Sequence, residues 1–293
     1  MKKSLCLSLL AVWLLSSCQS TRNFSSPRSG EYSAKASSSS ASGYKNVKRV
    51  KEYEFSHRDV PAAFDGCRLA FVSDLHYRSL LKEKGLKDVT RLLNDLHADA
   101  LLIGGDLHEG CEYAPAVIAA LGAVKTPLGT YAVLGNNDYE ACYEDIVKEM
   151  ERQGIHLLEH KVDTLRRNGA RILIAGVRDP FNLEQNGESP TLPLSSDDFV
   201  ILLTHTPDYA EDVPITNTDL VLAGHTHGGQ VTLFGLYAPI IPSHYGQRFL
   251  TGLKYNSKGT PIIITNGIGT SNKNVRLFAP SEVVVVTLRR LSE

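Results

Sequence analysis

Side chains able to bind metal ions recur in this chain directly after short apolar runs. Asp74-Leu75-His76 follows one run, Gly105-Asp106 the next, and Gly135-Asn136-Asn137-Asp138 a third. His205 and Gly224-His225-Thr226-His227 follow two later runs. Carboxylate, amide oxygen and imidazole are donors that suit Mn, Fe, Zn or Mg. The candidate metal ligands are Asp74, His76, Asp106, Asn136, His205, His225 and His227.

This donor set is too large for one ion and suits two divalent ions that share a bridging carboxylate. Two ions roughly 3.5–4 Å apart can bind a phosphate oxygen, generate hydroxide near neutral pH and stabilise in-line displacement at phosphorus. Glycine beside three of the motifs lets the backbone approach closely without an obstructing Cβ. The pattern therefore predicts a dinuclear site with two divalent cofactor ions, whose identity among Mn, Fe, Zn and Mg stays open.

The apolar runs before these motifs are typical of buried strands. They cover residues 69–72, 100–103, 130–134, 199–203 and 220–222, with a further run at 262–264. Apolar residues three and four apart predict helices over 89–96 and 139–151. Alternating strands and helices indicate an α/β fold, in which sites form at the carboxyl ends of strands. The strand-rich tail, 262–288, suggests a second sheet, so we expect a four-layer α/β/β/α sandwich.

The ordered set D-x-H, G-D, G-N, H and G-H-x-H resembles that of the calcineurin-like metallophosphoesterases, over about residues 67–230. The stretch from Gly229-Gln230 to Arg276-Leu277-Phe278 looks like the bacterial membrane-associated phosphodiesterase branch of that family. The resemblance implies a first ion held by Asp74, His76, Asp106 and His227. It implies that Asp106 bridges to a second ion, completed by Asn136, His205 and His225. The implied nucleophile is a metal-bridging hydroxide rather than a protein side chain.

Position 137 departs from the family pattern, G-N-H-D/E, whose histidine is thought to protonate the leaving oxygen or steady the transition state. Asn137 can donate a hydrogen bond but cannot give up a proton, and losing a general acid typically costs about 10²–10⁴ in rate. Either the enzyme acts on esters with good leaving groups, or His108, beside Glu109, supplies the proton. The plainer interpretation makes His108 a solvent-facing loop histidine. The candidate catalytic residues are Asn137, Asp138 and His108.

The amino-terminal residues have the features of an export signal. Lys2 and Lys3 precede an apolar run, 5–15, that is too short to span a bilayer. Leu15-Ser16-Ser17-Cys18 resembles a bacterial lipobox, which implies a lipid on Cys18, and an ordinary signal peptide is the alternative. Ten of the 25 residues 19–43 are serine, which indicates a flexible segment. The expected organisation is a lipoprotein signal peptide at 1–18, a Ser-rich tether at 19–46 and a phosphoesterase domain at 47–293.

The remaining composition limits the partners. A net charge of −1 gives no indication of a nucleic-acid or anionic-membrane surface. Once Cys6 leaves with the signal and Cys18 carries the lipid, Cys67, Cys111 and Cys142 remain. Their odd number leaves at least one unpaired unless it bonds another molecule, and a disulfide between two of them stays open.

The expected function is a metal-dependent phosphohydrolase, a phosphodiesterase or pyrophosphatase acting at the cell envelope. Its substrate would be a phosphoester, either lipid-linked or a nucleotide sugar. Its location would be that of an exported bacterial lipoprotein, anchored to the membrane and facing the periplasm or the cell exterior. A phosphomonoesterase is less favoured without a histidine acid, and a catalytically weakened scaffold that binds a partner is the non-enzymatic alternative. Segment 181–196, after Asp179-Pro180, is either a substrate-side lid or a solvated connection.

Overall fold

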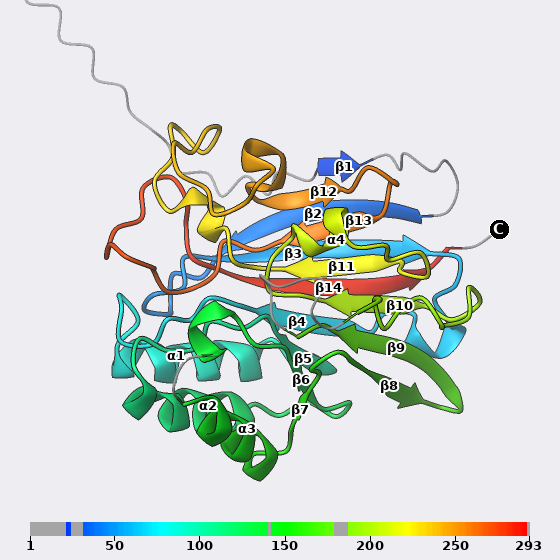
Figure 1. The fold of residues 1–293 in the computed structure, drawn as a ribbon, viewed down its shortest axis with the longest axis horizontal. Coiled ribbons are helices and arrows are strands. Elements are labelled where there is room, and N and C mark those ends of the chain that lie inside the picture. The colour runs from blue at the N-terminus through cyan, green and yellow to red at the C-terminus, as the bar shows by residue number, and fades with distance from the viewer. Residues whose placement is uncertain (1–21, 25–31, 140–141, 179–186, 292–293) are drawn as a thin grey trace, which may run out of the picture.

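The computed structural model describes residues 22–24, 32–139, 142–178 and 187–291, and these form two stacked β-sheets flanked by helices (Figure 1). In spatial order, the strands of the first sheet are β1 Arg22–Phe24, β2 Tyr32–Ser40, β3 Arg49–His57, β14 Glu282–Arg290, β4 Arg68–Val72, β5 Ala100–Ile103, β6 Thr130–Ala132 and β7 Ile155–Leu157. Those of the second sheet are β12 Gly252–Tyr255, β13 Pro261–Ile264, β11 Leu220–Ala223, β10 Val200–Leu203, β9 Ala170–Gly176 and β8 Lys161–Arg167.

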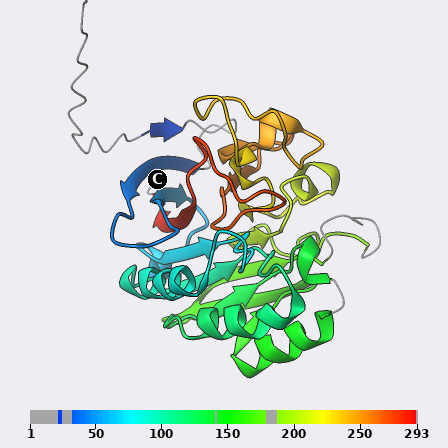
Figure 2. The same cartoon turned by 90° about the vertical axis from the view of Figure 1, so that its left-hand side faces the viewer.

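Three helices pack on the outer face of the first sheet, as Figures 1 and 2 show for the described part of the chain. They are α1 Glu83–Asp95, α2 Ala114–Gly122 and α3 Tyr143–Arg152. The outer face of the second sheet is covered by α4 Tyr209–Asp212 and by loops, and the core there includes Tyr209 and Phe249. Single 3-10 turns are η1 Ala62–Phe64, η2 Cys111–Tyr113, η3 Asn136–Tyr139, η4 His227–Gly229 and η5 Gly246–Phe249.

The predicted α/β class with two sheets is confirmed, and the alternation within the strands explains how the layers form. In β4, Leu69 and Phe71 enter the core between the sheets, whereas Ala70 and Val72 contribute to the core under the helices. Because both faces of this strand are buried, the whole run is apolar. The fourth layer is thinner than expected, since its only helix in the described residues has four residues.

The tail divides between the two sheets, which corrects the expectation that it forms the second sheet. Strand β13 does belong to the second sheet, parallel to β11. Strand β14 instead runs through the first sheet, parallel to β3 and antiparallel to β4. Its residues Val283 and Val285 lie in the core under the helices, while Val284 and Val286 lie between the sheets. An apolar run of this kind shows that both faces are buried but not which sheet receives it.

The expectation of a flexible tether is wrong for residues 32–40. They form β2, which pairs with β3 in an antiparallel register from Tyr32↔His57 to Ser40↔Arg49. The side chains of Tyr32, Ala34 and Ala36 are buried, so a period-two pattern is present within the serine-rich composition. The first sheet therefore begins before residue 47. The predicted signal peptide, Cys18 and the tether residues 19–21 and 25–31 lie outside the described residues.

Two further features concern the cysteines and the helices. Cys111, in η2, forms a disulfide with Cys142, immediately before α3. Cys67 is a free, buried thiol, and burial raises its pKa to about 12. Within the described ranges, no helix combines the length and apolar character needed to cross a bilayer.

Candidate metal centre

The candidate ligands lie at the carboxyl ends of parallel strands drawn from both sheets. Asp74 and His76 follow β4, and Asp106 follows β5. Backbone hydrogen bonds continue between the two chain segments after β4 and β5 have ended. The Asp74 N–H donates to the Gly105 carbonyl at 2.9 Å, and the His76 N–H donates to the Asp106 carbonyl at 3.0 Å. The ligand loops are therefore held in register by backbone bonds. From the remaining strands come Asn136 after β6, His205 after β10, and His225 and His227 after β11.

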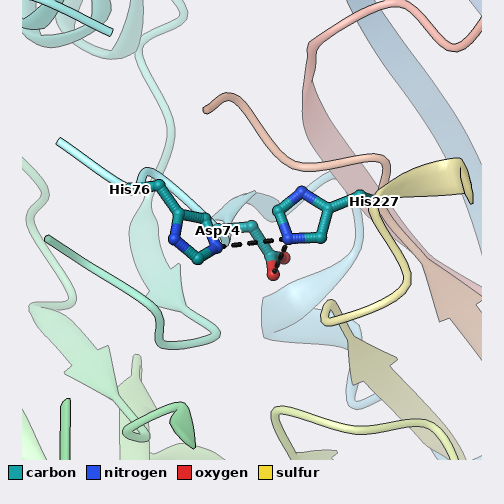
Figure 3. Close-up of side chains that lie close together, drawn as sticks. All are labelled: Asp74, His76 and His227. Atoms are coloured by element: carbon teal, nitrogen blue, oxygen red, sulfur yellow. Dashed lines mark hydrogen bonds and ion pairs between the residues drawn. The ribbon is translucent and has the colours of Figure 1, made fainter. Parts of the chain in front are cut away.

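Asp74, His76 and His227 form one buried triad (Figure 3). His227 Nε2 lies 3.4 Å from Asp74 Oδ1 and 3.2 Å from His76 Nε2. The donor atoms of all three residues thus face a common point. A carboxylate with two imidazoles is a donor set that suits the divalent ions expected from the sequence.

Asp106, His205 and His225 form a second triad. His205 Nε2 lies 3.5 Å from Asp106 Oδ2 and 3.1 Å from His225 Nδ1. The same Asp106 oxygen is 3.3 Å from His76 Nε2 of the first triad. Asp106 therefore stands between the two triads, where a bridging carboxylate is required.

Asn136 supplies an independent sign that a cation fits here. Its Oδ1 is buried and accepts no hydrogen bond, whereas its Nδ2 donates to Asn137 Oδ1 at 2.8 Å. A buried acceptor without a donor is costly unless a ligand or ion satisfies it. Asn136 lines the same cavity as Asp106, His225 and His227. The donors that the sequence singled out are thus brought together.

Outer partners fix the orientation of three of the imidazoles. His205 Nδ1 donates to the Gly104 carbonyl at 2.7 Å, and His76 Nδ1 donates to Glu109 Oε1 at 2.6 Å. The His225 ring donates to the carbonyl of Pro242. In each case one ring nitrogen carries its proton outward, which leaves the other as a lone-pair donor toward the centre. The bond from His76 to Glu109 was not predicted, and its only sequence signal is the place of Glu109 three residues after Asp106.

The charges at the centre are strongly coupled. Burial opposes protonation of His76, but the carboxylates of Asp106 and Glu109 outweigh it and raise its pKa to about 10. Burial likewise opposes protonation of His205, whose pKa is nevertheless raised to about 9, chiefly by Asp106. Burial together with the neighbouring His205 lowers the pKa of His225 to about 3. Despite its burial, the pKa of Asp106 is held well below its usual range by His205 and His76.

Five of the candidate ligands have left-handed backbone conformations. Their φ angles are 52° at Asp74, 40° at His76, 54° at Asp106, 67° at His225 and 53° at His227. This region is unfavourable for residues with a Cβ, and such strain accumulates at functional sites because the surroundings enforce it. The conformation is imposed by the close approach of neighbouring loops. Glycine is required at two of these contacts. A Cβ atom added to Gly135 would collide with Asp106 Oδ1, and a Cβ atom added to Gly224 would collide with Asp74 Oδ2.

Asn137 and Asp138 have different placements. The Asn137 N–H donates to Asp106 Oδ1 at 2.9 Å, and its Nδ2 lies 3.5 Å from Glu109 Oε1. Asp138 is fully buried and accepts the N–H groups of Asp106 at 2.8 Å, Gly135 at 2.9 Å and Leu107 at 3.0 Å. Asp138 therefore positions the Asp106 loop, and its assignment as a catalytic candidate stays a prediction.

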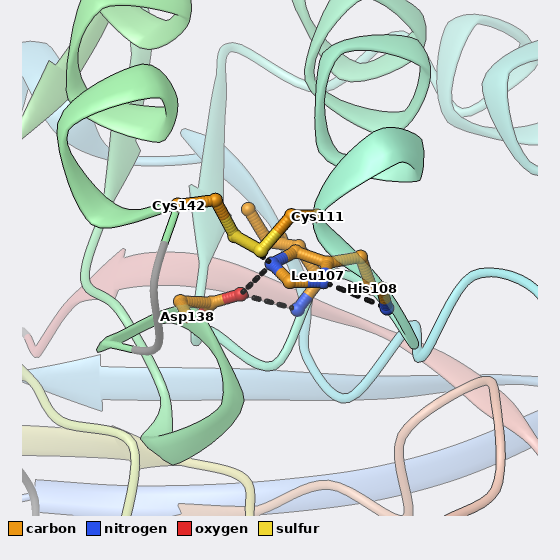
Figure 4. Close-up of a disulfide and its surroundings, with 6 residues drawn as sticks. Leu107, His108, Cys111, Asp138 and Cys142 are labelled. Carbon is orange, nitrogen blue, oxygen red and sulfur yellow. Dashed lines mark hydrogen bonds and ion pairs between the residues drawn. A yellow bond between two sulfur atoms is a disulfide. The ribbon is translucent and has the colours of Figure 1, made fainter.

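The structure contradicts the solvent-facing interpretation of His108. The ring is 1% exposed, so it is not a solvent-facing loop residue. Its Nδ1 accepts the Gly110 N–H at 3.1 Å, while Nε2 lies 3.5 Å from Cys142 Sγ and 3.8 Å from Asp138 Oδ1 (Figure 4). His108 does not line the cavity over the two triads, and its role as a proton donor stays a prediction.

Arg276 is a positioning residue whose role the sequence did not predict. Its guanidinium donates to the carbonyls of Gly269 at 2.6 Å, Asn266 at 2.7 Å, His227 at 3.0 Å and Ala279 at 3.2 Å. These bonds tie the loop that carries His227 to the segment after β13. In the sequence, the only signal for Arg276 is its place in Arg276-Leu277-Phe278, the end of the stretch that resembles a branch of the family.

A third histidine–carboxylate cluster, His57, Asp59 and Asp219, also brings one donor atom from each residue within 4.8 Å of the others, but none of its residues lines the cavity over the two triads. Asp59 Oδ2 lies 3.6 Å from His57 Nδ1, and Asp219 Oδ1 lies 3.6 Å from His57 Nε2. The carboxylates flank opposite nitrogens of the ring. Of the segment considered as a lid, 181–196, residues 181–186 lie outside the described ranges, and 187–196 form turns without strand or helix.

Comparison with known proteins identifies the family of this chain. A model of the calcineurin-like phosphoesterase family matches residues 67–229, more than half of the chain. The chain belongs to the calcineurin-like phosphoesterases. It is therefore a hydrolase of phosphoester bonds, in a family that depends on two metal ions.

Its relatives include proteins of several bacteria. An uncharacterized metallophosphoesterase of Bacillus subtilis, YkuE, is 31% identical over 235 residues, which cover 78% of this chain and 82% of that protein. One from Helicobacter pylori is 28% identical over 228 residues, covering 75% of this chain but only 59% of that protein. Among solved structures, a dimetal phosphatase of Danio rerio covers 70% of this chain and 89% of its own, with 12% identity and a TM-score of 0.41.

Proposed function

We propose that this phosphoesterase is a phosphodiesterase or pyrophosphatase that acts at the cell envelope on esters with good leaving groups. The observation that carries the proposal is the absence of a spare histidine or carboxylic acid among the described residues that line the cavity over the metal centre. Apart from the candidate ligands Asp106, His225 and His227, the ionisable side chain in that lining is Lys273. A leaving group that departs as a stable anion needs no proton from the protein.

The ligand residues account for the hydrolytic chemistry. Two bound divalent ions would supply an activated water near neutral pH and neutralise charge on the phosphoryl group. The two triads and Asn136 provide donors for both ions, and Asp138 and Arg276 hold the Asp106 and His227 loops in place. The Asn137 amide, beside Glu109, can orient an oxygen but cannot transfer a proton. Lys273 adds a cation on the wall of the cavity that can attract an anionic substrate.

The location at the envelope is supported by the amino-terminal sequence. The basic start, the apolar run at 5–15 and Leu15-Ser16-Ser17-Cys18 are features of an exported lipoprotein with its anchor on Cys18. A membrane-held phosphohydrolase would meet lipid-linked phosphoesters or nucleotide sugars at the face where it resides. Cys18→Ser tests the anchor: membrane association and the mature mass should both change, whereas activity on a soluble ester should persist.

A substrate panel on the metal-loaded full chain tests the activity. Bis-aryl diesters and pyrophosphate-linked lipids should be hydrolysed, and alkyl monoesters should react far more slowly. An enzyme that cleaves alkyl monoesters as fast as activated diesters would show that it has a proton donor and would overturn the proposal. A chain that binds two ions and hydrolyses none of the panel would instead support the alternative of a binding scaffold.

A further inference from the structure

Two loops beside the metal centre expose an unusual concentration of large apolar side chains. Among the described residues, ten large hydrophobic side chains are exposed, and eight of them lie on these loops. Leu236 is 82% exposed, Ile240 80% and Phe234 78%. We call the set the apolar rim: Leu233, Phe234, Leu236, Tyr237, Ile240, Val275, Leu277 and Phe278. Exposed apolar patches of this kind mark interaction surfaces.

The apolar rim is one surface built from two segments. The rings of Phe234 and Phe278 lie 5.4 Å apart. The Thr232 N–H donates to the Leu277 carbonyl at 3.0 Å, and the Leu277 N–H donates to the Gln230 carbonyl at 2.8 Å. Both segments project at the left of Figure 1, the first in yellow to gold and the second in orange to red.

Hydrogen bonds from Gln230 and Arg276 fix the backbone of the two segments that form the apolar rim. The Gln230 side chain exchanges two hydrogen bonds with the backbone of Ser271, both at 2.9 Å. Arg276 turns its guanidinium inward to four backbone carbonyls, so its neighbours Val275 and Leu277 face outward. The exposure is thus a property of a fixed scaffold rather than of two unsupported loops.

The charge around the apolar rim is one-sided. Residues 221–281 contain five Lys or Arg and no Asp or Glu, although the whole chain has a net charge of −1. Of these cations, Arg248 pairs with Glu211 and Arg276 bonds inward, so Lys273 is the exposed cation within the two segments of the rim, 230–243 and 270–280. The net charge of the whole chain is near zero and gave no indication of a membrane surface. It averages over the long segment 221–281, which contains no carboxylate side chain. Exposed Lys273 lies beside the rim at the cavity. Large aliphatic and aromatic side chains with an exposed lysine and no carboxylate in their own segments match the interface of a bilayer that contains anionic lipids.

The cavity over the metal centre opens within the apolar rim. This cavity has a volume of about 430 Å³, and Ile240 and Val275 belong both to its wall and to the rim. Asp106 and Asn136 line the same cavity at the metal centre. An ester whose apolar part stays in a bilayer could therefore present its phosphate to the ligands without leaving the lipid.

We propose that the apolar rim inserts into the surface of an anionic lipid bilayer and that the substrates are phosphoesters of membrane lipids, received directly from that surface. The docking follows from the rim alone, whereas the substrate class rests on the proposed phosphohydrolase function. The two parts can therefore fail separately.

A fluorescence experiment tests the docking. Trp13 is the only tryptophan of the chain, so Trp13→Phe with Leu236→Trp places a single reporter in the apolar rim. The matched control is Trp13→Phe with Val162→Trp, because Val162 is an exposed apolar residue on the edge strand β8. Both full-length chains keep the same amino terminus. Vesicles of phosphatidylglycerol and brominated phosphatidylcholine should shift the emission of the rim reporter to the blue and quench it, and should leave the control unchanged.

Two results would overturn the docking. One is equal behaviour of the two reporters. The other is a blue-shifted rim reporter without vesicles that depends on protein concentration, which would show that a second copy of the chain covers the rim. Vesicles of phosphatidylcholine and brominated phosphatidylcholine alone should quench the rim reporter less, because Lys273 then lacks an anionic partner, and equal quenching would refute the electrostatic part.

An activity experiment tests the substrate class. Phe234→Ser with Leu236→Ser, in the metal-loaded chain, should lower the rate on a phosphoester lipid in phosphatidylglycerol vesicles by roughly tenfold or more. The rate on a soluble bis-aryl diester should not change, since neither residue lines the cavity. Val162→Ser is the control and should alter neither rate. Equal losses on both substrates would refute the membrane route. Docking without hydrolysis of either substrate would refute the proposed function and leave the docking intact.

Discussion

Glu109 Oε1 lies 2.6 Å from His76 Nδ1, on the side of the ring opposite the metal centre. The contact fixes the tautomer that directs Nε2 toward Asp106 and His227. It also places a carboxylate where it strengthens His76 as a donor. Glu109 thus influences the metal centre by orienting His76, and it is a positioning residue rather than a ligand.

Removing this carboxylate should weaken the first triad. Glu109→Gln should lower metal affinity by roughly 10–100-fold, the usual cost of losing an outer partner of a metal ligand. Glu109→Asp should retain part of that affinity. Titration calorimetry on metal-free protein measures the effect, and Glu112→Gln, an exposed glutamate nearby, is the control. Unchanged affinity in Glu109→Gln would mean that the hydrogen bond does not orient His76.

The place of Asp106 between the triads predicts a larger effect. Asp106→Asn should lower both metal content and turnover, because the amide supplies one uncharged oxygen in place of a carboxylate that faces both triads. The loss of affinity should exceed that of Glu109→Gln. Elemental analysis at saturating Mn should find two ions per wild-type chain and fewer in the variant, with exposed Asp197→Asn as the control. One ion or none in an active wild-type enzyme would contradict a two-ion centre.

The missing acid can be supplied by substitution. Asn137→His should increase hydrolysis of alkyl esters by up to about 10²-fold if the imidazole reaches the leaving oxygen, and should change activated esters little. Parallel kinetics on esters of graded leaving-group pKa measure the difference. No gain on any alkyl ester would indicate that proton donation does not limit the wild-type rate.

His108 should behave as an interior residue. His108→Ala removes a ring packed against Cys142 and Asp138, so it should reduce the free energy of unfolding by about 1–3 kcal/mol. The ratio of rates on alkyl and activated esters should stay at the wild-type value. Chemical denaturation and the same kinetic series measure both quantities. A selective loss of alkyl-ester activity would restore His108 as a proton donor.

Metal binding should release protons. In the metal-free protein the pKa values of His76 and His205 are raised to about 10 and about 9, so both rings are protonated at pH 7. A protonated imidazole cannot ligate, and raising the pH toward these pKa values removes the competing proton. Metal affinity should therefore rise between pH 6.5 and 8.5, roughly tenfold per pH unit for each proton displaced. Calorimetry in buffers of different ionisation enthalpy counts the protons, and a pH-independent affinity would contradict the prediction.

The fold and the ligand set were predictable because their signals are local. Asp74 and Asp106 each follow a short run of apolar residues typical of a buried strand, and the carboxyl ends of parallel strands meet at one edge of a sheet. The bond between Glu109 and His76 and the inward turn of Arg276 were not predictable, because each depends on side chains that only the tertiary structure brings together. The burial of His108 depends in the same way on the disulfide at Cys142.

Strand β2 was missed for a different reason. Its serine content indicated disorder, whereas the alternation of Tyr32, Ala34 and Ala36 indicated a strand. Composition averages over both faces of a strand, and in β2 one face is buried while the other is open enough for serine. The path of β14 into the first sheet was equally hidden, because a valine run fits either sheet.

The early start of the first sheet limits how far the enzyme could range from a membrane. A chain anchored at Cys18 has four peptide units before Arg22 enters β1, which pairs with β2, and this corresponds to a fully extended length of about 14 Å. Such an enzyme could change its orientation on the membrane but could not reach substrates far from the surface. Lateral diffusion of lipids in one leaflet would then set its supply of substrate.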